Sequence, residues 1–167
     1  MSKYCIDTSG LSHPYEEIPE DIHESLWKRV RKTVVDGHVA VTKEIFDEVV
    51  LIDGGLGAYL NKHKSLIIHE VEAGKWNWQK YVAIAAKMQT DHRPFIREYC
   101  GGSPKTICLN DISIIALAKT LKLPVVSMER PVQQGATKRR HIPDICAAEG
   151  VPHLTFSDFC RTEGYHF

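Results

Sequence analysis

The chain has 167 residues, 43% of them apolar, with 21 basic and 21 acidic residues and an isoelectric point near 7.1. This length predicts one domain over residues 1–167, and the apolar fraction is sufficient for a buried core. The balanced charge excludes a global field that would attract nucleic acid, so any polyanion site needs a local basic patch.

The cysteine pattern and the N-terminus exclude further classes. Five cysteines, at positions 5, 100, 108, 146 and 160, show no CxxC or CxC spacing, which argues against a disulfide framework and a zinc ribbon. The N-terminus carries no apolar signal segment, and no run approaches the roughly 18 apolar residues of a membrane span. The sequence therefore predicts a soluble, cytoplasmic protein with no membrane partner.

The first half of the chain alternates short apolar runs with amphipathic segments. We expect strands at 3–6 and 38–41, a loop at 11–19, helices at 20–36, 43–51 and 56–64, and either a strand or a helix extension at 66–69. Thr42 is expected to cap the helix at 43–51. One buried face of the helix at 20–36 is predicted from apolar residues spaced three and four apart, namely Ile22, Leu26, Trp27, Val30 and Val34.

The second half continues the alternation. We expect helices at 76–88, 94–99, 111–121 and 142–149, strands at 123–128 and 151–155, and a terminal helix capped by Ser157. The helix at 76–88 is expected to bury Trp78, Val82, Ala85 and Ala86. Pro143 and Gly150 fit the start and end of the helix at 142–149.

Strands that alternate with helices along the whole chain predict an α/β fold, with a central, mostly parallel sheet between two helical layers. In such three-layer α/β/α sheets, ligands bind at the carboxyl ends of the strands, near the point where the strand order reverses.

Four acids, each at the end of a predicted strand or within a predicted helix, are the candidate site. They are Asp7, Glu48, Asp111 and Glu129. Carboxylates brought close together repel one another, and a divalent cation is the usual means of offsetting that repulsion. Oxygen ligands without dedicated His or Cys point to Mg²⁺ or Mn²⁺, and such ions usually act on phosphates.

Three of the four acids also have a structural interpretation. Asp7, before Thr-Ser-Gly, fits an Asx turn. Asp111 fits a helix cap, a role compatible with metal binding. Glu129 could instead form a surface ion pair with Arg130 or with the basic loop that follows it.

Four segments carry a family resemblance: IDTSG, VTKEIFDEV, NDISIIALAKTLKLPVVSME and HIPDICAAEGVPHLTFSDF. In order and spacing the chain resembles PIN-domain proteins, and in particular the PIN-like branch grouped as the domain of unknown function DUF4411. The resemblance covers the full length, although residues 54–103 contain little that is diagnostic. It implies a PIN-like nuclease fold with a Mg²⁺ or Mn²⁺ site, ribonuclease activity and, for many bacterial members, a toxin role with a cognate antitoxin and a homodimer.

Carried over by position, the resemblance makes Asp7 the metal ligand of the first strand and Thr8 or Ser9 its hydroxyl neighbour. Asp111 becomes the acid at the start of the buried helix, and Glu48 the acid of the helix at 43–51. Within that helix Glu44 and Asp47 are rivals, and the family spacing favours Glu48.

Glu129 departs from the family pattern, which has Asp after a Thr-x pair, whereas this chain has Ser127-Met128 before Glu129. Because Glu is one methylene longer, Glu129 could act on the metal through a water, or its role could pass to Asp144 in HIPDIC. Asp144 equally fits an early-turn acid favoured by the helix dipole.

Basic residues follow the last predicted site acid. Arg130 and the run Lys138-Arg139-Arg140 could clamp the phosphates of RNA, since Arg offers paired donors to phosphate. A solvated surface loop is the other interpretation.

Three functions fit to different degrees. The first is a metal-dependent endoribonuclease, a toxin with an antitoxin partner. The second is a PIN-like RNA- or protein-binding module without catalysis, kept open by Glu129. The third, a phosphatase, lacks the second acid that should follow Asp7 two residues on.

Overall fold

The computed structural model describes residues 1–103, 106–133, 135 and 138–166. Within these residues five strands form one sheet in the order β3-β2-β1-β4-β5, and every neighbouring pair is parallel. The strands are β1 (Tyr4–Ile6), β2 (Val39–Thr42), β3 (Ile68–His69), β4 (Val125–Val126) and β5 (His153–Leu154). The predicted α/β class with a parallel central sheet is confirmed.

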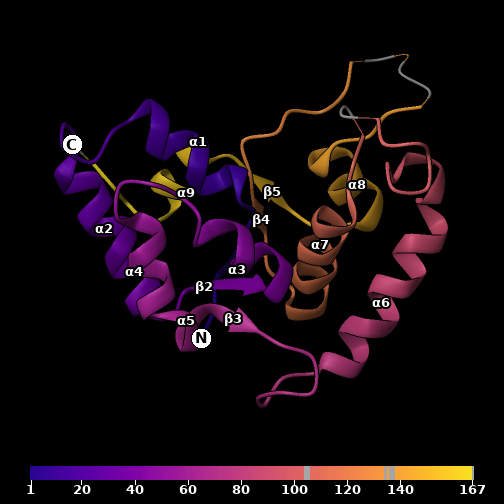
Figure 1. Cartoon of the computed structure of the whole chain (residues 1–167), viewed down its shortest axis with the longest axis horizontal. Helices are drawn as coiled ribbons and strands as arrows, with labels where there is room; N and C mark the ends of the chain where they lie inside the picture. Colours follow the sequence, from indigo (N-terminus) through magenta and orange to yellow (C-terminus); the bar gives the residue numbers. More distant parts are fainter. Residues whose placement is uncertain (104–105, 134, 136–137, 167) are drawn as a thin grey trace.

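Helices cover both faces of the sheet (Figure 1). One side carries α1 (Ser9–Glu17), α2 (Glu24–Val35), α4 (Leu56–Lys62) and α9 (Phe156–Thr162). The other side carries α7 (Leu109–Leu121) and α8 (Ile142–Glu149), with α6 (Trp78–Asp91) packed along α7. The remaining elements are α3 (Lys43–Val49), α5 (Lys64–Ile67) and the 3₁₀ turn η1 (Arg93–Phe95).

The strand order reverses beside β1. The chain passes from β1 to β2 and β3 on one side, and then returns to place β4 and β5 on the other. Ile6 is paired with Val126, and the backbone N–H of Asp7 donates to the Val126 carbonyl at 2.9 Å. The residues that follow β1 and β4 therefore lie side by side at the carboxyl edge of the sheet, the position where α/β sheets bind ligands.

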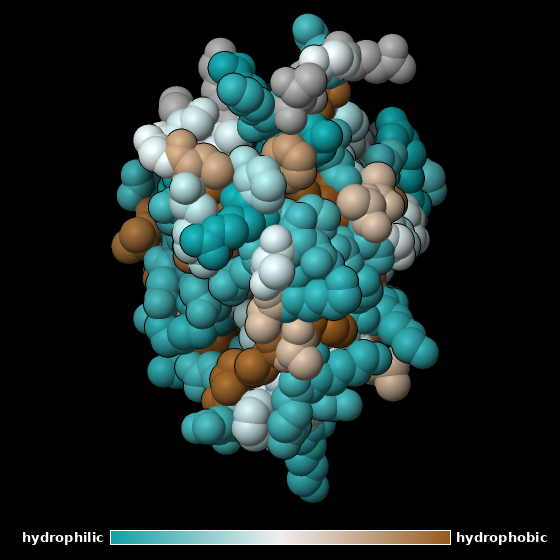
Figure 2. All heavy atoms as spheres, turned by 90° about the vertical axis from the view of Figure 1, so that its right-hand side faces the viewer, coloured by the Kyte–Doolittle hydropathy of each residue, from teal (hydrophilic) through white to brown (hydrophobic). Residues whose placement is uncertain are grey.

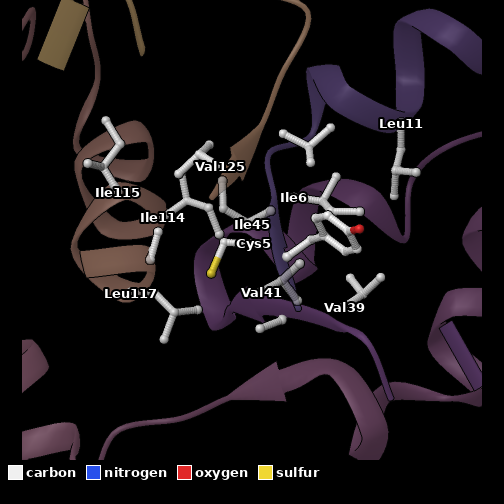
Figure 3. Packing of buried hydrophobic residues seen from close by; sticks show 14 of the residues in the cluster. Cys5, Ile6, Leu11, Val39, Val41, Ile45, Ile114, Ile115, Leu117 and Val125 are labelled. Carbon is white, nitrogen blue, oxygen red and sulfur yellow. The ribbon is translucent and has the colours of Figure 1, made fainter. Parts of the chain in front are cut away.

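The core extends over both faces of the sheet, with Trp27 and Phe159 buried on one face and α7 packed on the other. Strand residues such as Cys5, Val41 and Val125 face Ile114 and Leu117 of α7 (Figure 3). All seven residues from Ile112 to Ala118 are buried, which explains why α7 is apolar on all sides. At 13 residues α7 is still short, and no helix in the described part of the chain is long and apolar enough to cross a membrane.

Several local predictions are confirmed. Thr42 caps α3, because its hydroxyl accepts the backbone N–H of Ile45 at 3.3 Å. Helix α8 has Pro143 in its first turn and ends at Gly150, whose φ of 68° is the left-handed conformation that favours glycine. Residues 66–69, which the sequence left undecided, are helical up to Ile67 and extended at Ile68–His69.

The expected loop at 11–19 is wrong, because α1 occupies most of it and contains Pro14. Burial of Leu11 and Pro14 stabilises this helix beyond what the proline costs locally. The next helix begins at Glu24, later than expected, so Ile22 lies outside it and is 71% exposed. Glu20 forms an ion pair with Arg31 at 2.7 Å.

The expected face of the helix at 76–88 is also wrong. Val82 is exposed, whereas Tyr81 and Met88 are the buried residues of α6. Of the predicted residues Ala85 does pack against the core, together with Ile84, whereas Ala86 is exposed like Val82. The last helix is capped by Thr155, whose hydroxyl accepts the N–H of Asp158 at 3.2 Å, and not by Ser157.

Two further segments are shorter than expected. Of the predicted helix at 94–99 only the turn η1 forms, and Ile96 instead makes a parallel bridge to Ile107. Of the predicted strand at 123–128 only Val125–Val126 pairs as β4.

Candidate functional site

Asp7 leaves β1 at the carboxyl edge and is only 4% exposed. Its Oδ2 accepts the backbone N–H of Ser9 at 3.0 Å and the Ser9 hydroxyl at 2.7 Å. The same Ser9 oxygen accepts the N–H of Met128 at 3.1 Å. Ser9 therefore holds the Asp7 carboxylate and also ties the loop after β1 to the loop after β4.

Glu48 faces this edge from α3. The Thr8 hydroxyl donates to its Oε2, and the Asn110 side-chain amide donates to its Oε1 at 2.6 Å. Its rivals Glu44 and Asp47 are exposed on the same helix. The structure therefore brings Glu48, and neither of its neighbours, to the other candidate acids.

Asp111 is the third residue of α7, and its Oδ2 accepts the backbone N–H of Cys108 at 2.8 Å. This bond caps the helix, as one interpretation of the sequence predicted. Burial, followed by the charges of Asp7 and Glu129, raises the pKa of Asp111 to about 7 against the opposing hydrogen bonds from Cys108. Asp111 therefore caps α7 and also interacts electrostatically with other acids of the site.

Asp7 shows the same electrostatic effect. Burial raises the pKa of Asp7 to about 6, although the hydrogen bonds from Ser9 favour the ionised form. The charges of Glu129 and Glu48 add to the rise. The charges of Glu48 and Glu129 therefore act on Asp7, and those of Asp7 and Glu129 act on Asp111.

Glu129 and Asp144 occupy different places at the start of α8. Glu129 Oε2 accepts the N–H of Ile142, the first residue of the helix, at 2.8 Å. Asp144 Oδ2 accepts the N–H groups of His141 at 2.8 Å and Val132 at 3.2 Å. Asp144 is thus a helix cap, and Glu129 is the acid whose charge acts on Asp7 and Asp111.

Among the described residues, the four acids have no ion-pair partner. None of the ion pairs among the described residues includes Asp7, Glu48, Asp111 or Glu129, so the expected pair between Glu129 and Arg130 is not formed there. The donors that hold the acids are instead hydroxyl, amide and backbone groups.

The donor set can be compared with what a hard divalent ion requires. In the described part of the chain no group of three or more Asp, Glu, His or Cys side chains is arranged to hold a metal ion. Mg²⁺, however, is usually bound through one or two carboxylates, with water and phosphate oxygens completing the shell. Both hydrogen bonds to Asp7 use Oδ2. An uncompensated carboxylate pair such as Asp7 and Asp111 fits that mode of binding.

The predicted basic residues lie beyond Glu129. Arg130, Lys138 and Arg139 are exposed, while the Arg140 guanidinium carbon lies 4.4 Å from the centre of the Phe95 ring. The solvated-loop interpretation therefore fits the first three side chains, and Arg140 is held against a neighbouring segment.

Two positioning contacts were not predicted from the sequence. Asn110 holds Glu48, and the only signal was its place directly before Asp111. Ser127 is fully buried, and its hydroxyl bonds His153 Nε2 at 2.7 Å and accepts the N–H of Glu129 at 3.4 Å. This pair of contacts fixes the turn that carries Glu129.

Comparison with known proteins adds a family but no activity. No curated protein matches the sequence. A family model described as "Domain of unknown function (DUF4411)" matches residues 4–167, and the chain therefore belongs to this family.

Proposed function

We propose that this protein is a Mg²⁺- or Mn²⁺-dependent endoribonuclease of the PIN type, and that it is the toxin of a bacterial toxin–antitoxin system. The observation that carries the enzymatic part is the interacting pair of the buried Asp7 and the partly buried Asp111, with pKa values raised to about 6 and about 7. Strongly shifted acids in the ligand-binding region of a fold are typical of functional sites. The toxin role, with RNA as substrate and an antitoxin as partner, is supported by the resemblance to PIN-domain proteins.

In this proposal the residues of the site have different roles. Asp7 and Asp111 are the central acids, and the raised pKa of each suits proton exchange near neutral pH. Glu48 and Glu129 flank them, each held by hydrogen bonds that fix the direction of its carboxylate. Thr8 and Ser9 orient Glu48 and Asp7 respectively.

The proposed reaction is hydrolysis of a phosphodiester. A bound divalent ion would supply a water of lowered pKa and polarise the phosphoryl oxygen. The buried carboxylates would orient the attacking water and accept its proton, with Asp7 Oδ1 as the oxygen that the bonds from Ser9 leave available. Attack by water predicts products with 5′-phosphate and 3′-hydroxyl ends.

The second candidate is a PIN-like RNA- or protein-binding module without catalysis. Two observations favour it: the tie between Glu129 and the Ile142 N–H, and the lack of a ready three-ligand metal group among the residues that the structure describes. Metal binding and cleavage separate the two candidates.

The test is a calorimetric titration of Mn²⁺ into metal-free protein, followed by incubation of the protein with total RNA and end-labelling of the products. Wild type is compared with Asp7→Asn and Asp111→Asn, and with Asp47→Asn as an exposed control from the helix of Glu48. We expect saturable binding and cleavage that the first two substitutions abolish and the control retains. A folded wild type that neither binds Mn²⁺ nor cleaves RNA would refute the nuclease proposal and favour the binding module.

A further inference from the structure

Two segments that are distant in sequence concentrate positive charge. Residues 92–103 and 128–141 contain six Lys or Arg and two Asp or Glu, although the whole chain has 21 of each class. We call their basic residues the basic rim, which consists of Arg93, Arg97, Arg130, Lys138, Arg139 and Arg140. The sequence suggested only the last four, because Arg93 and Arg97 stand far from any predicted site residue.

The fold joins the two segments. Arg140 stacks on Phe95, with its guanidinium carbon 4.4 Å from the ring centre. In Figure 1 the described residues that follow α6 lie on the same side of the molecule as α8. The outer face there, seen in Figure 2, is largely hydrophilic. The rim is therefore one surface feature, built from both halves of the chain.

The rim borders the acids. Glu98, next to Arg97, accepts the N–H of Leu109 at 3.3 Å, at the start of the helix that carries Asp111. On the other segment His141 Nδ1 lies 2.7 Å from the Arg130 carbonyl oxygen, adjacent to Glu129. A ligand on the rim would therefore lie next to Asp111 and Glu129.

The opposite flank of the acids has the reverse charge. A pocket beside α1 and α3 is lined by Glu16, Glu48 and Asp53, together with uncharged residues such as Tyr15. A polyanion is repelled on that flank and attracted on the other. This asymmetry gives a polyanionic chain one favourable approach to the site.

Aromatic rings lie among the rim cations. The Arg93 guanidinium carbon lies 4.7 Å from the centre of the Tyr99 ring, and Tyr99 is 43% exposed. Stacked arginines are restrained in position and still offer donors to phosphate. Positive surfaces with exposed aromatic rings are characteristic of single-strand binding, since unpaired bases stack on the rings while the cations follow the backbone.

We propose that the basic rim binds single-stranded RNA along its phosphate backbone and leads it past Asp111 and Glu129. This inference rests on the proposed function in that it assigns the path of the substrate. Binding by the rim itself requires neither metal nor cleavage, so the two can be tested separately.

The experiment measures the affinity of metal-free protein for a labelled single-stranded RNA of about 12 nucleotides by fluorescence anisotropy, over a series of salt concentrations. Arg97→Gln is the first variant, because Arg97 is exposed and its ion pair among the described residues is a long one, to Glu98 at 3.8 Å. Loss of one phosphate contact is expected to lower the slope of log K against log salt by about 0.7 and weaken binding about five- to tenfold at low salt. Arg93→Gln should have a similar effect.

Controls separate the rim from a general loss of charge. Lys28→Gln removes one exposed charge from α2, on the opposite side of the molecule in Figure 1, and is expected to leave affinity and slope unchanged. Arg97→Lys keeps the charge and should retain most of the salt slope. Unfolding temperatures verify that each variant is folded.

The inference would be overturned if wild type did not bind the RNA, or if Arg97→Gln and Arg93→Gln bound it as tightly as wild type does. It would also be overturned if Lys28→Gln weakened binding to the same extent, or if a duplex of equal length bound as tightly as the single strand. RNA binding that depends on the rim, in a wild type that cleaves nothing with Mn²⁺, would support the rim and refute the nuclease. If wild type cleaves RNA and the rim variants bind RNA normally, the nuclease proposal is supported and the rim is refuted.

Discussion

Replacing Asp7 by Asn should stabilise the metal-free protein at pH 8. The pKa of Asp7 rises from 3.8 to about 6 on folding, chiefly through burial. A rise of about 2 units corresponds to about 3 kcal/mol by which ionisation of Asp7 destabilises the folded state above that pKa. Asparagine has nearly the same shape, and its amide oxygen can still accept both hydrogen bonds from Ser9. The substitution therefore removes the buried charge and leaves its surroundings in place.

The assay is thermal unfolding followed by circular dichroism in chelator, from pH 4 to pH 8. For a chain of this size 1 kcal/mol shifts the melting temperature by about 2–4 °C, so the variant should gain about 6 to 12 °C at pH 8. Because folding raises the pKa of Asp7, the contribution of this residue to wild-type stability is fully present below pH 3.8. That contribution is lost as the pH rises through about 6. The gain of the variant should therefore be small at pH 4 and complete by pH 8.

The difference between variant and wild type isolates Asp7 from histidines that titrate in the same range. The pKa values of His69 and His153, for example, are lowered by burial in both proteins. Asp47→Asn, an exposed control, should change the melting temperature little at any pH. A loss of stability in Asp7→Asn, or a gain that does not depend on pH, would refute the reasoning.

Two other substitutions test the supports of the site. Asn110→Ala removes the amide that holds Glu48 and should slow RNA cleavage about 10–100-fold, as loss of a ligand-orienting contact typically does, with a folded protein verified by circular dichroism; unchanged cleavage would exclude that role. Gly10→Ala would place a methyl group 2.6 Å from the Val126 carbonyl oxygen. The substitution should reduce the free energy of unfolding, measured by urea titration, by about 1–3 kcal/mol. Full stability of the variant would show that the two loops can separate without cost.

Local chemistry allowed parts of the fold to be predicted. Pro143 and Gly150 act through their own backbone preferences, and both mark the ends of α8 as expected. Pro14 shows the limit of such rules, because a proline in the middle of a segment usually excludes a helix. Helix α1 nevertheless forms around Pro14, because other parts of the chain bury Leu11 and Pro14, and rules based on local sequence do not include those contacts.

The sequence predicted those parts of the site that depend only on where the strands end. Asp7 and Glu129 follow β1 and β4, so a parallel sheet was enough to expect them at one edge. The partner of each carboxylate oxygen could not be expected in the same way. Asn110 and Glu48 are 62 residues apart, and their contact depends on how α7 and α3 pack. Helix packing depends on side-chain shape across the whole core, which periodicity does not describe.

The hydrogen bonds divide the four acids into two kinds. Glu48 accepts from Thr8 and Asn110, and Glu129 accepts from the first N–H of α8, where the helix dipole favours negative charge. The extra methylene of Glu129 thus has a structural consequence, because its carboxylate rests on the end of a helix while its charge still acts on the buried pair.

Asp7 and Asp111 lie at the centre, and the flanking charge of Glu129 raises the pKa of both. Their ionisation is therefore the step that costs free energy in the metal-free protein. A cation that binds the ionised pair would recover that free energy as affinity, since only the folded protein brings the two carboxylates together. The carboxylate of Glu129 thus rests on the first turn of α8 and still raises the pKa of both Asp7 and Asp111.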